Sequence, residues 1–212
     1  MIIKWIVCEV EDEKKQAFSA AQEKWLEIKG AKGFLAQVGG WDLENQNVAC
    51  IIAFWESRAD LYSFMSNLHD KIFHGNNQVE TYKSIQISHF YDRIEMRGSG
   101  ESLLEAARLS KLLRIADCEA KPDRIAHFEK VQKEIWLPGM KDSNGMLGGV
   151  FSQDINQNNH YLVSTFWDTQ ENHSDYVKFK LPVFQKKADI KSDLLDITGR
   201  KVRLMDSWSI IK

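Results

Sequence analysis

The feature that most constrains this chain is a repeat within its own sequence. Residues 2–26 align without gaps to residues 112–136, and residues 33–55 align to residues 145–167. In the second block seven of 23 positions are identical: Gly33, Leu35, Val38, Asp42, Asn47, Phe54 and Trp55 match Gly145, Leu147, Val150, Asp154, Asn159, Phe166 and Trp167. Because both blocks agree in order and in hydrophobic pattern, the sequence predicts an internal duplication.

Each copy has the pattern of a β-α-β-β-α-β unit. The strands expected in the first copy span residues 2–10, 34–41, 48–55 and 82–94, and the last strand of the second copy is expected over 200–211. Helical spacing of apolar residues follows the first and third strands. Ser57 and Thr169 stand where a helix N-cap would accept a hydrogen bond from a free backbone amide, so both predict the start of a helix.

This element order predicts the fold class. A β-α-β-β-α-β unit places two helices on one face of a four-stranded antiparallel sheet, which is the ferredoxin-like arrangement. The strand over residues 2–10 is apolar on both of its faces, so the second face of the sheet needs a cover. We therefore expect an α+β protein of tandem ferredoxin-like repeats, packed sheet to sheet as an intramolecular pseudo-dimeric α/β barrel.

The domain boundaries follow from the same pattern. The first repeat is expected over residues 1–96 and the second over residues 112–212. Between them, residues 97–111 form a linker that opens with Arg97-Gly98-Ser99-Gly100 and continues with the Ala, Leu and Glu composition of a short helix.

With these elements in place, the chain resembles the dimeric α/β-barrel superfamily, which contains antibiotic-biosynthesis-monooxygenase-like and haem-degrading proteins. It looks like the two-repeat bacterial proteins of unknown function within that group. The resemblance covers both repeats through strand order and through the signature Phe-Trp-acid-Ser/Thr, at residues 54–57 and 166–169. It implies a cavity between sheet and helices that takes a small molecule.

Charge and composition bear on partners and location. A net charge of −2 and a pI near 6.3 give no basic face for nucleic acid or for a membrane surface. No apolar run approaches the length of a membrane span and the first residues have no signal-peptide pattern, so a cytoplasmic protein is expected. The three cysteines form no CxxC pair and no histidines have ligand spacing, so neither a metal nor a tightly bound cofactor is predicted.

Three side chains of the first repeat are the predicted catalytic groups. Gln37 interrupts an apolar strand, and such a residue either pairs with another polar group or enters a pocket. His89 shares strand parity with Ile85 and Ile87, so its imidazole is either a satisfied core group or a base near a pocket. Trp41 belongs to a set of tryptophans that form either core or the wall of an aromatic cavity.

One further histidine is a candidate through the resemblance alone. His74 follows Phe73 in the region where haem-degrading relatives carry their iron ligand, so it is the predicted cofactor-binding residue if haem is bound. The segment from His74 to Asn77 reads equally well as the end of a helix and a loop.

Two functions remain open on the sequence. The first is a cofactor-independent, monooxygenase-like enzyme that acts on an apolar or aromatic small molecule. The second is a non-catalytic module that binds a small molecule or haem, or that acts in stress. The copies differ at Gln37, His74 and His89, so a site is expected in one repeat, first of all the N-terminal one. The chain could be a monomeric pseudo-dimer or form a homodimer.

Overall fold

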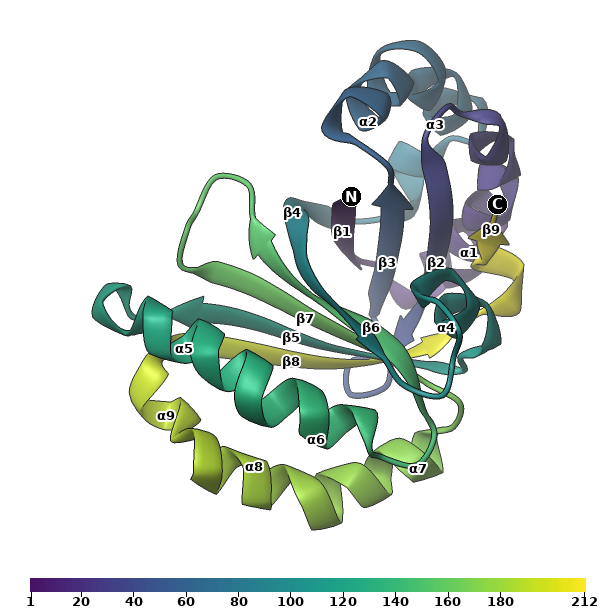
Figure 1. Cartoon of the computed structure of the whole chain (residues 1–212). Helices are drawn as coiled ribbons and strands as arrows, with labels where there is room; N and C mark the ends of the chain where they lie inside the picture. Colours follow the sequence, from purple (N-terminus) through teal and green to yellow (C-terminus); the bar gives the residue numbers. More distant parts are fainter. The chain divides into compact units, whose positions relative to one another are not determined.

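The computed structural model describes residues 1–212 (Figure 1). By its internal contacts the chain divides into two compact units. The first unit consists of Met1–Phe90 together with Val202–Lys212, and the second consists of Tyr91–Lys201. None of the helices is both long enough and apolar enough to cross a membrane.

The first unit is built on an antiparallel sheet. Strand β3 (Val48–Trp55) is buried along its whole length and pairs with β1 (Ile2–Glu9) on one side and with β2 (Phe34–Asp42) on the other. Strand β4 (Ser84–Arg97) begins in this unit next to β1, and its last residues belong to the second unit. The C-terminal β9 (Ile210–Ile211) pairs with β2.

Two helical segments accompany this sheet. The first runs through α1 (Lys15–Glu23) and a 3₁₀ segment over Lys24–Gly30. The second runs through α2 (Arg58–Phe64), a π-helical turn over Met65–His69 and α3 (Asp70–Gly75). As predicted, the hydroxyl of Ser57 caps the second segment by accepting a hydrogen bond from the amide of Asp60 at 3.1 Å.

The second unit has the same order of elements. Its sheet holds β5 (Leu112–Ala120), β6 (Met146–Asp154), β7 (His160–Trp167) and most of β8 (Leu194–Leu204). The helices are α4 (Leu103–Leu109), α5 (Ile125–Val131), α6 (Leu137–Lys141), α7 (Gln170–Asp175), α8 (Leu181–Ala188) and α9 (Ile190–Asp193). Figure 1 shows α5, α6, α8 and α9 along one face of this sheet. Thr169 is the predicted cap and accepts from the amide of Asn172 at 3.1 Å.

The strand registers of the two units match residue for residue. Ile2 pairs with Trp55 as Leu112 pairs with Trp167. The ladder between β2 and β3 has a bulge after Phe34, and that between β6 and β7 has one after Met146. A duplication requires this agreement; the duplication itself, and the packing of the two repeats sheet to sheet, stay predictions. The α+β class is confirmed.

The structure differs from the sequence prediction at the C-terminus. The strand expected over residues 200–211 is instead β8, which starts at Leu194, followed by a 3₁₀ turn over Asp206–Trp208 and the short β9. The turn places Trp208 in a buried cluster with Cys8 and Phe18, where its indole packs 5.6 Å from the ring of Phe18. Burial of this large ring explains the break in the strand, and it explains why residues 202–212 group with the first unit.

Candidate functional site

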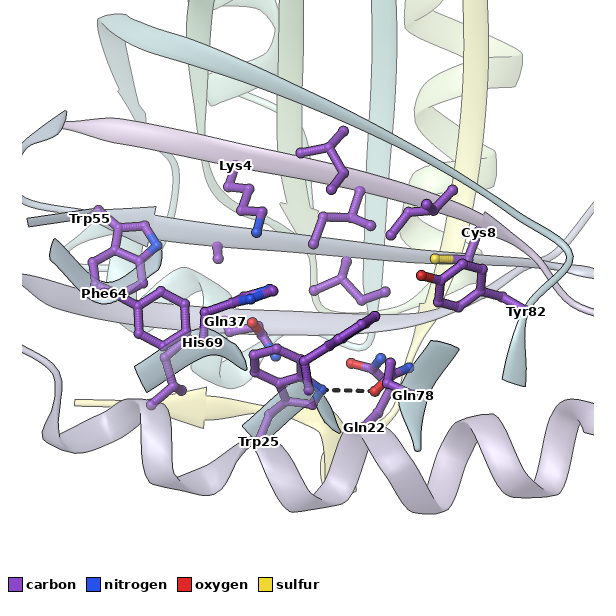
Figure 2. Close-up of a pocket in the computed structure, with 17 residues that line it drawn as sticks. Lys4, Cys8, Gln22, Trp25, Gln37, Trp55, Phe64, His69, Gln78 and Tyr82 are labelled. Carbon is purple, nitrogen blue, oxygen red and sulfur yellow. Dashed lines mark hydrogen bonds between the residues drawn. The ribbon is translucent and has the colours of Figure 1, made fainter. Parts of the chain in front are cut away.

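A pocket lies in the first unit between its sheet and its helices (Figure 2). The space that atoms leave unfilled there is about 580 Å³, part of it open to solvent. Most of the wall is apolar and aromatic. The side chains that bring polar atoms to it are Lys4, Gln22, Gln37, His69, Gln78 and Tyr82. An apolar cavity with a few convergent polar groups is the usual form of a small-molecule site.

Lys4 carries a charge in this pocket without a carboxylate partner. Only 7% of the residue is exposed, and its ammonium makes one contact, at 3.6 Å from the sulfur of Met65. A thioether is a weak acceptor and cannot neutralise an ammonium group. Burial lowers the pKa of Lys4 to about 8. At neutral pH the pocket therefore contains an uncompensated positive charge, which favours an anionic ligand.

The strand register brings Lys4 and Gln37 into the same row. Ala53 of β3 pairs with Lys4 on one side and with Gln37 on the other, so the three side chains point to the same face of the sheet. The small alanine leaves space between the two longer side chains. The amide of Gln37 is buried and hydrogen-bonds no other side chain, so it can donate to or accept from a ligand.

His69 reaches the pocket from the helical side, and in Figure 2 the side chain of Lys4 points toward it. Its Nδ1 lies 2.8 Å from Oδ1 of Asp70. An ionised carboxylate can only accept, so Nδ1 carries the proton and Nε2 has a free lone pair. Burial lowers the pKa of His69, the hydrogen bond to Asp70 raises it, and the charge of Lys4 lowers it further. The net shift is downward, so the imidazole is neutral and basic at pH 7.

The π-helical turn over Met65–His69 explains the position of this histidine. A π turn bonds residue i to residue i+5, so residues five apart come onto one face of the helix. The ring of His69 accordingly lies 5.8 Å from that of Phe64, which is five residues earlier, and 5.5 Å from that of Trp25. At α-helical spacing His69 does not share the apolar face, so it was not predicted from the sequence. The adjacent pair His69-Asp70 was the signal that could have found it.

Three further groups complete the wall. The indole N–H of Trp25 donates to Oε1 of Gln78 at 2.9 Å, which fixes both side chains. Burial raises the pKa of the Cys8 thiol to about 12, so it stays protonated and is no nucleophile. The indole N–H of Trp55 is buried without a hydrogen-bond acceptor, although Trp55 borders the pocket. This unused donor adds to the preference for a ligand that supplies acceptor atoms.

Only one of the residues predicted from the sequence borders this pocket, and that is Gln37. Trp41 is half-buried and packs on Phe18 and Trp208, with ring centres at 5.7 and 5.4 Å. His89 is half-buried on β4, outside the residues that line the pocket. His74 is exposed on α3 and its ring touches that of Phe73.

The second unit has a pocket at the equivalent place, bordered by Arg114, Gln132, Trp136 and Tyr176 among others, with about 560 Å³ of unfilled space. A site was expected in one repeat, whereas both units have a cavity. No group of three His, Cys, Asp or Glu side chains in the structure could hold a metal ion.

Comparison with known sequences concerns the first unit. Residues 2–90 match the family described as "Domain of unknown function (DUF4937)". Over 90 residues the chain is 37% identical to the uncharacterised protein YdbC of Bacillus subtilis (strain 168), which covers 42% of this chain and 76% of that protein.

Comparison with solved structures concerns the whole chain. A candidate monooxygenase from Fusobacterium nucleatum superposes with a TM-score of 0.80 at 13% identity, covering 100% of this chain and 94% of the other. A candidate monooxygenase from Lactobacillus acidophilus gives 0.73 at 12% identity, with 100% and 98% covered. An anthrone oxidase-like protein gives 0.71 at 10% identity, with 96% and 91% covered. At these identities the similarity establishes the fold alone, and the predicted resemblance is confirmed at the level of the fold.

Proposed function

Since the chain belongs to the DUF4937 family through residues 2–90 and shares its fold with candidate monooxygenases and an anthrone oxidase-like protein, we propose that the pocket of the first unit is an oxygenase site. Its substrate is a weakly acidic aromatic small molecule, such as a phenol or an enolisable aromatic ketone. O₂ is the oxidant, and no tightly bound cofactor takes part.

One observation carries this proposal: a neutral histidine oriented by a carboxylate lies in the same apolar pocket as an unpaired ammonium group. Nε2 of His69 removes the acidic proton of the substrate, and Lys4 stabilises the anion that results. Such an anion is electron-rich enough to give electrons to O₂ directly. The surrounding aromatic wall limits the access of water to the anion and to the products of its reaction with O₂.

The reaction can be written with an anthrone-type methylene as the reacting group. His69 takes one of its two hydrogens as a proton, and the carbanion that remains forms a C–O bond with O₂. Loss of the second hydrogen as a proton breaks the O–O bond, and the carbon becomes a carbonyl. The outer oxygen takes up this proton and the one that His69 removed, and it leaves as water, so His69 is neutral again. Gln37, which shares a row of the sheet with Lys4, donates a hydrogen bond to the oxygen of the substrate. The catalytic roles predicted for Trp41 and His89 stay untested.

The experiment is O₂ uptake by the full chain with anthrone, followed by absorbance of the product. The proposal expects one O₂ consumed per anthrone at a rate above that in buffer, and no uptake with 9,10-dihydroanthracene, which lacks the acidifying carbonyl group. Anthrone oxidation no faster than in buffer would contradict the proposed reaction for this substrate class.

The second function open on the sequence was binding without catalysis. It is favoured by the pocket of the second unit, which has no histidine in its wall. Saturable binding of anthrone without O₂ uptake would support it. Haem binding through His74 stays a separate prediction, and a haem titration of wild type and His74→Ala, followed at the Soret band, tests it.

A further inference from the structure

The pocket of the second unit contains a guanidinium group with no anionic partner. Arg114 lies on β5 at the position that aligns with Lys4 of β1, and it borders the pocket together with Thr165, its neighbour on β7. No carboxylate lies within ion-pair distance of it. Asp117, three residues further along β5, is instead 2.6 Å from Nε2 of His160. The positive charge of Arg114 is therefore not compensated by an acidic side chain.

The groups that surround Arg114 do not neutralise it. The two groups that would offset its charge if they were ionised are the thiol of Cys118 and the phenol of Tyr176. Burial raises the pKa of each to about 12, so both are uncharged at neutral pH. Arg114 itself is half-buried, and this partial burial lowers its pKa, although a guanidinium group stays protonated in proteins. An unpaired cation in a low-dielectric site attracts an anion more strongly than the same cation in water.

Two further donors border this pocket, and one of them is buried without an acceptor. The indole N–H of Trp136 is buried and has no hydrogen-bond partner, and Trp136 itself is 8% exposed. The hydroxyl of Tyr176, which also borders the pocket, stays protonated at neutral pH and is the second donor. Since buried donors in folded proteins almost always have partners, the excess of donors here indicates that acceptor oxygens arrive with a ligand.

The rest of the wall determines what such a ligand carries besides its acceptor oxygens. It is apolar and is formed by helices α5, α6, α8 and α9 and by the sheet, through Phe128, Met140, Val163, Leu181, Ile190 and Ile197. The fork of an arginine matches the two coplanar oxygens of a carboxylate in a bidentate pair. An apolar body with one carboxylate thus fits both the charge and the wall.

We propose that the pocket of the second unit is a second ligand site of this chain, which binds an apolar or aromatic carboxylate through Arg114 with the N–H of Trp136 as an additional donor. This site binds its ligand without removing a proton from it, because it has no histidine equivalent to His69. In the alignment that pairs Trp55 with Trp167, the residue at the position of His69 is Leu181. This second site goes beyond the proposed oxygenase function, and the proposal for it does not depend on that function.

The test uses 2-naphthoate and its uncharged analogue 2-naphthalenemethanol, with binding to the full chain measured by isothermal titration calorimetry. Lys4→Met serves as the background, so that an anion bound in the first pocket does not contribute. In that background we expect one 2-naphthoate per chain, bound at least tenfold more tightly than the alcohol.

Adding Arg114→Met to this background should weaken 2-naphthoate at least tenfold and leave the alcohol nearly unchanged. Arg114→Lys keeps the charge without the fork, and Trp136→Phe keeps the ring without the N–H, so each should weaken 2-naphthoate by a smaller factor. These two milder variants decide the question if Arg114→Met does not fold. The proposal is overturned if 2-naphthoate does not bind at millimolar concentration, if it binds no more tightly than the alcohol, or if the Arg114 and Trp136 variants bind it as the background does.

Discussion

Nδ1 of His69 lies 2.8 Å from Oδ1 of Asp70, and this contact determines which ring nitrogen is available to a ligand. The two residues are adjacent in the sequence, and Asp70 lies in solvent whereas the ring of His69 packs among Trp25, Phe64 and Phe73. The carboxylate is too exposed to stabilise the fold by much. Its effect is to hold one tautomer, with a basic Nε2 on the side of the ring away from Asp70.

Replacing Asp70 by Asn should lower the pKa of His69, because the hydrogen bond and the charge of Asp70 both favour the imidazolium form. We also expect a modest fall in kcat, up to about tenfold, because the tautomer is no longer fixed. An NMR titration of the His69 ring proton measures the pKa. Glu27→Gln, which removes another exposed carboxylate of this unit, is the control and should leave that pKa unchanged. A pKa that rises in Asp70→Asn would contradict the assignment.

The rate of oxidation should depend on pH through two groups. His69 must be neutral, so kcat/KM rises with pH through its pKa, which lies below the usual value of 6.5. Lys4 must be charged, so the rate falls again as pH passes the pKa of Lys4 at about 8. A pH profile from 5 to 9.5 should therefore be bell-shaped. In Lys4→Met the residual rate should lack the alkaline limb, and an unchanged limb in that variant would show that another group causes it.

The unpaired charge of Lys4 should cost the fold stability at neutral pH. Its pKa is about 8 in the folded state against 10.5 for an ordinary lysine. Between these values only the unfolded chain holds the proton, so the contribution of Lys4 to the unfolding free energy rises with pH across that window, by roughly 3 kcal/mol. Lys4→Met should thus be more stable than wild type at pH 7, and the difference should shrink toward pH 10.5. Urea denaturation of both proteins at several pH values measures the difference in unfolding free energy. If Lys4→Met were less stable than wild type at pH 7, the ammonium group of Lys4 would not be unpaired.

Gly33 should tolerate alanine poorly. Its φ of +69° is left-handed, and an added Cβ would run into the side chain of Asp60. We expect Gly33→Ala to lower the unfolding free energy by about 1–3 kcal/mol. Gly30→Ala is the matched control, since no atom lies within 4 Å of the Cβ that it would add. Equal stability of the two variants by urea denaturation would contradict the strained geometry.

Much of the fold could be predicted because two copies of one pattern constrain each other. Strand β3 runs over the predicted residues 48–55, and Ser57 and Thr169 cap their helices as predicted. Local chemistry determines such features: β-branched and apolar runs form strands, and a hydroxyl binds a free amide. The C-terminal strand was predicted wrongly because the burial of Trp208 is a tertiary effect that breaks an otherwise regular pattern.

The candidate site was predictable only in part. Gln37 was found because a polar residue in an apolar strand stands out. His69 was missed because the π turn shifts its side chain onto the face of the helical segment that packs on the sheet. At α-helical spacing the same residue would lie on another face. Lys4 and Arg114 were aligned with each other in the sequence, yet a cation in a strand usually faces solvent. Their lack of a carboxylate partner becomes visible only when the neighbouring strands and helices are in place.

The most direct test of the account compares two histidine variants, His69→Gln and His74→Gln, in anthrone oxidation under saturating substrate. Both are conservative changes on one helical segment, but only His69 borders the pocket. We predict that His69→Gln lowers kcat by about 10²–10⁴-fold with little change in Tm, and that His74→Gln has the wild-type rate. A wild-type rate in His69→Gln, with O₂ uptake by the unmodified chain established, would contradict the role of His69 as the base.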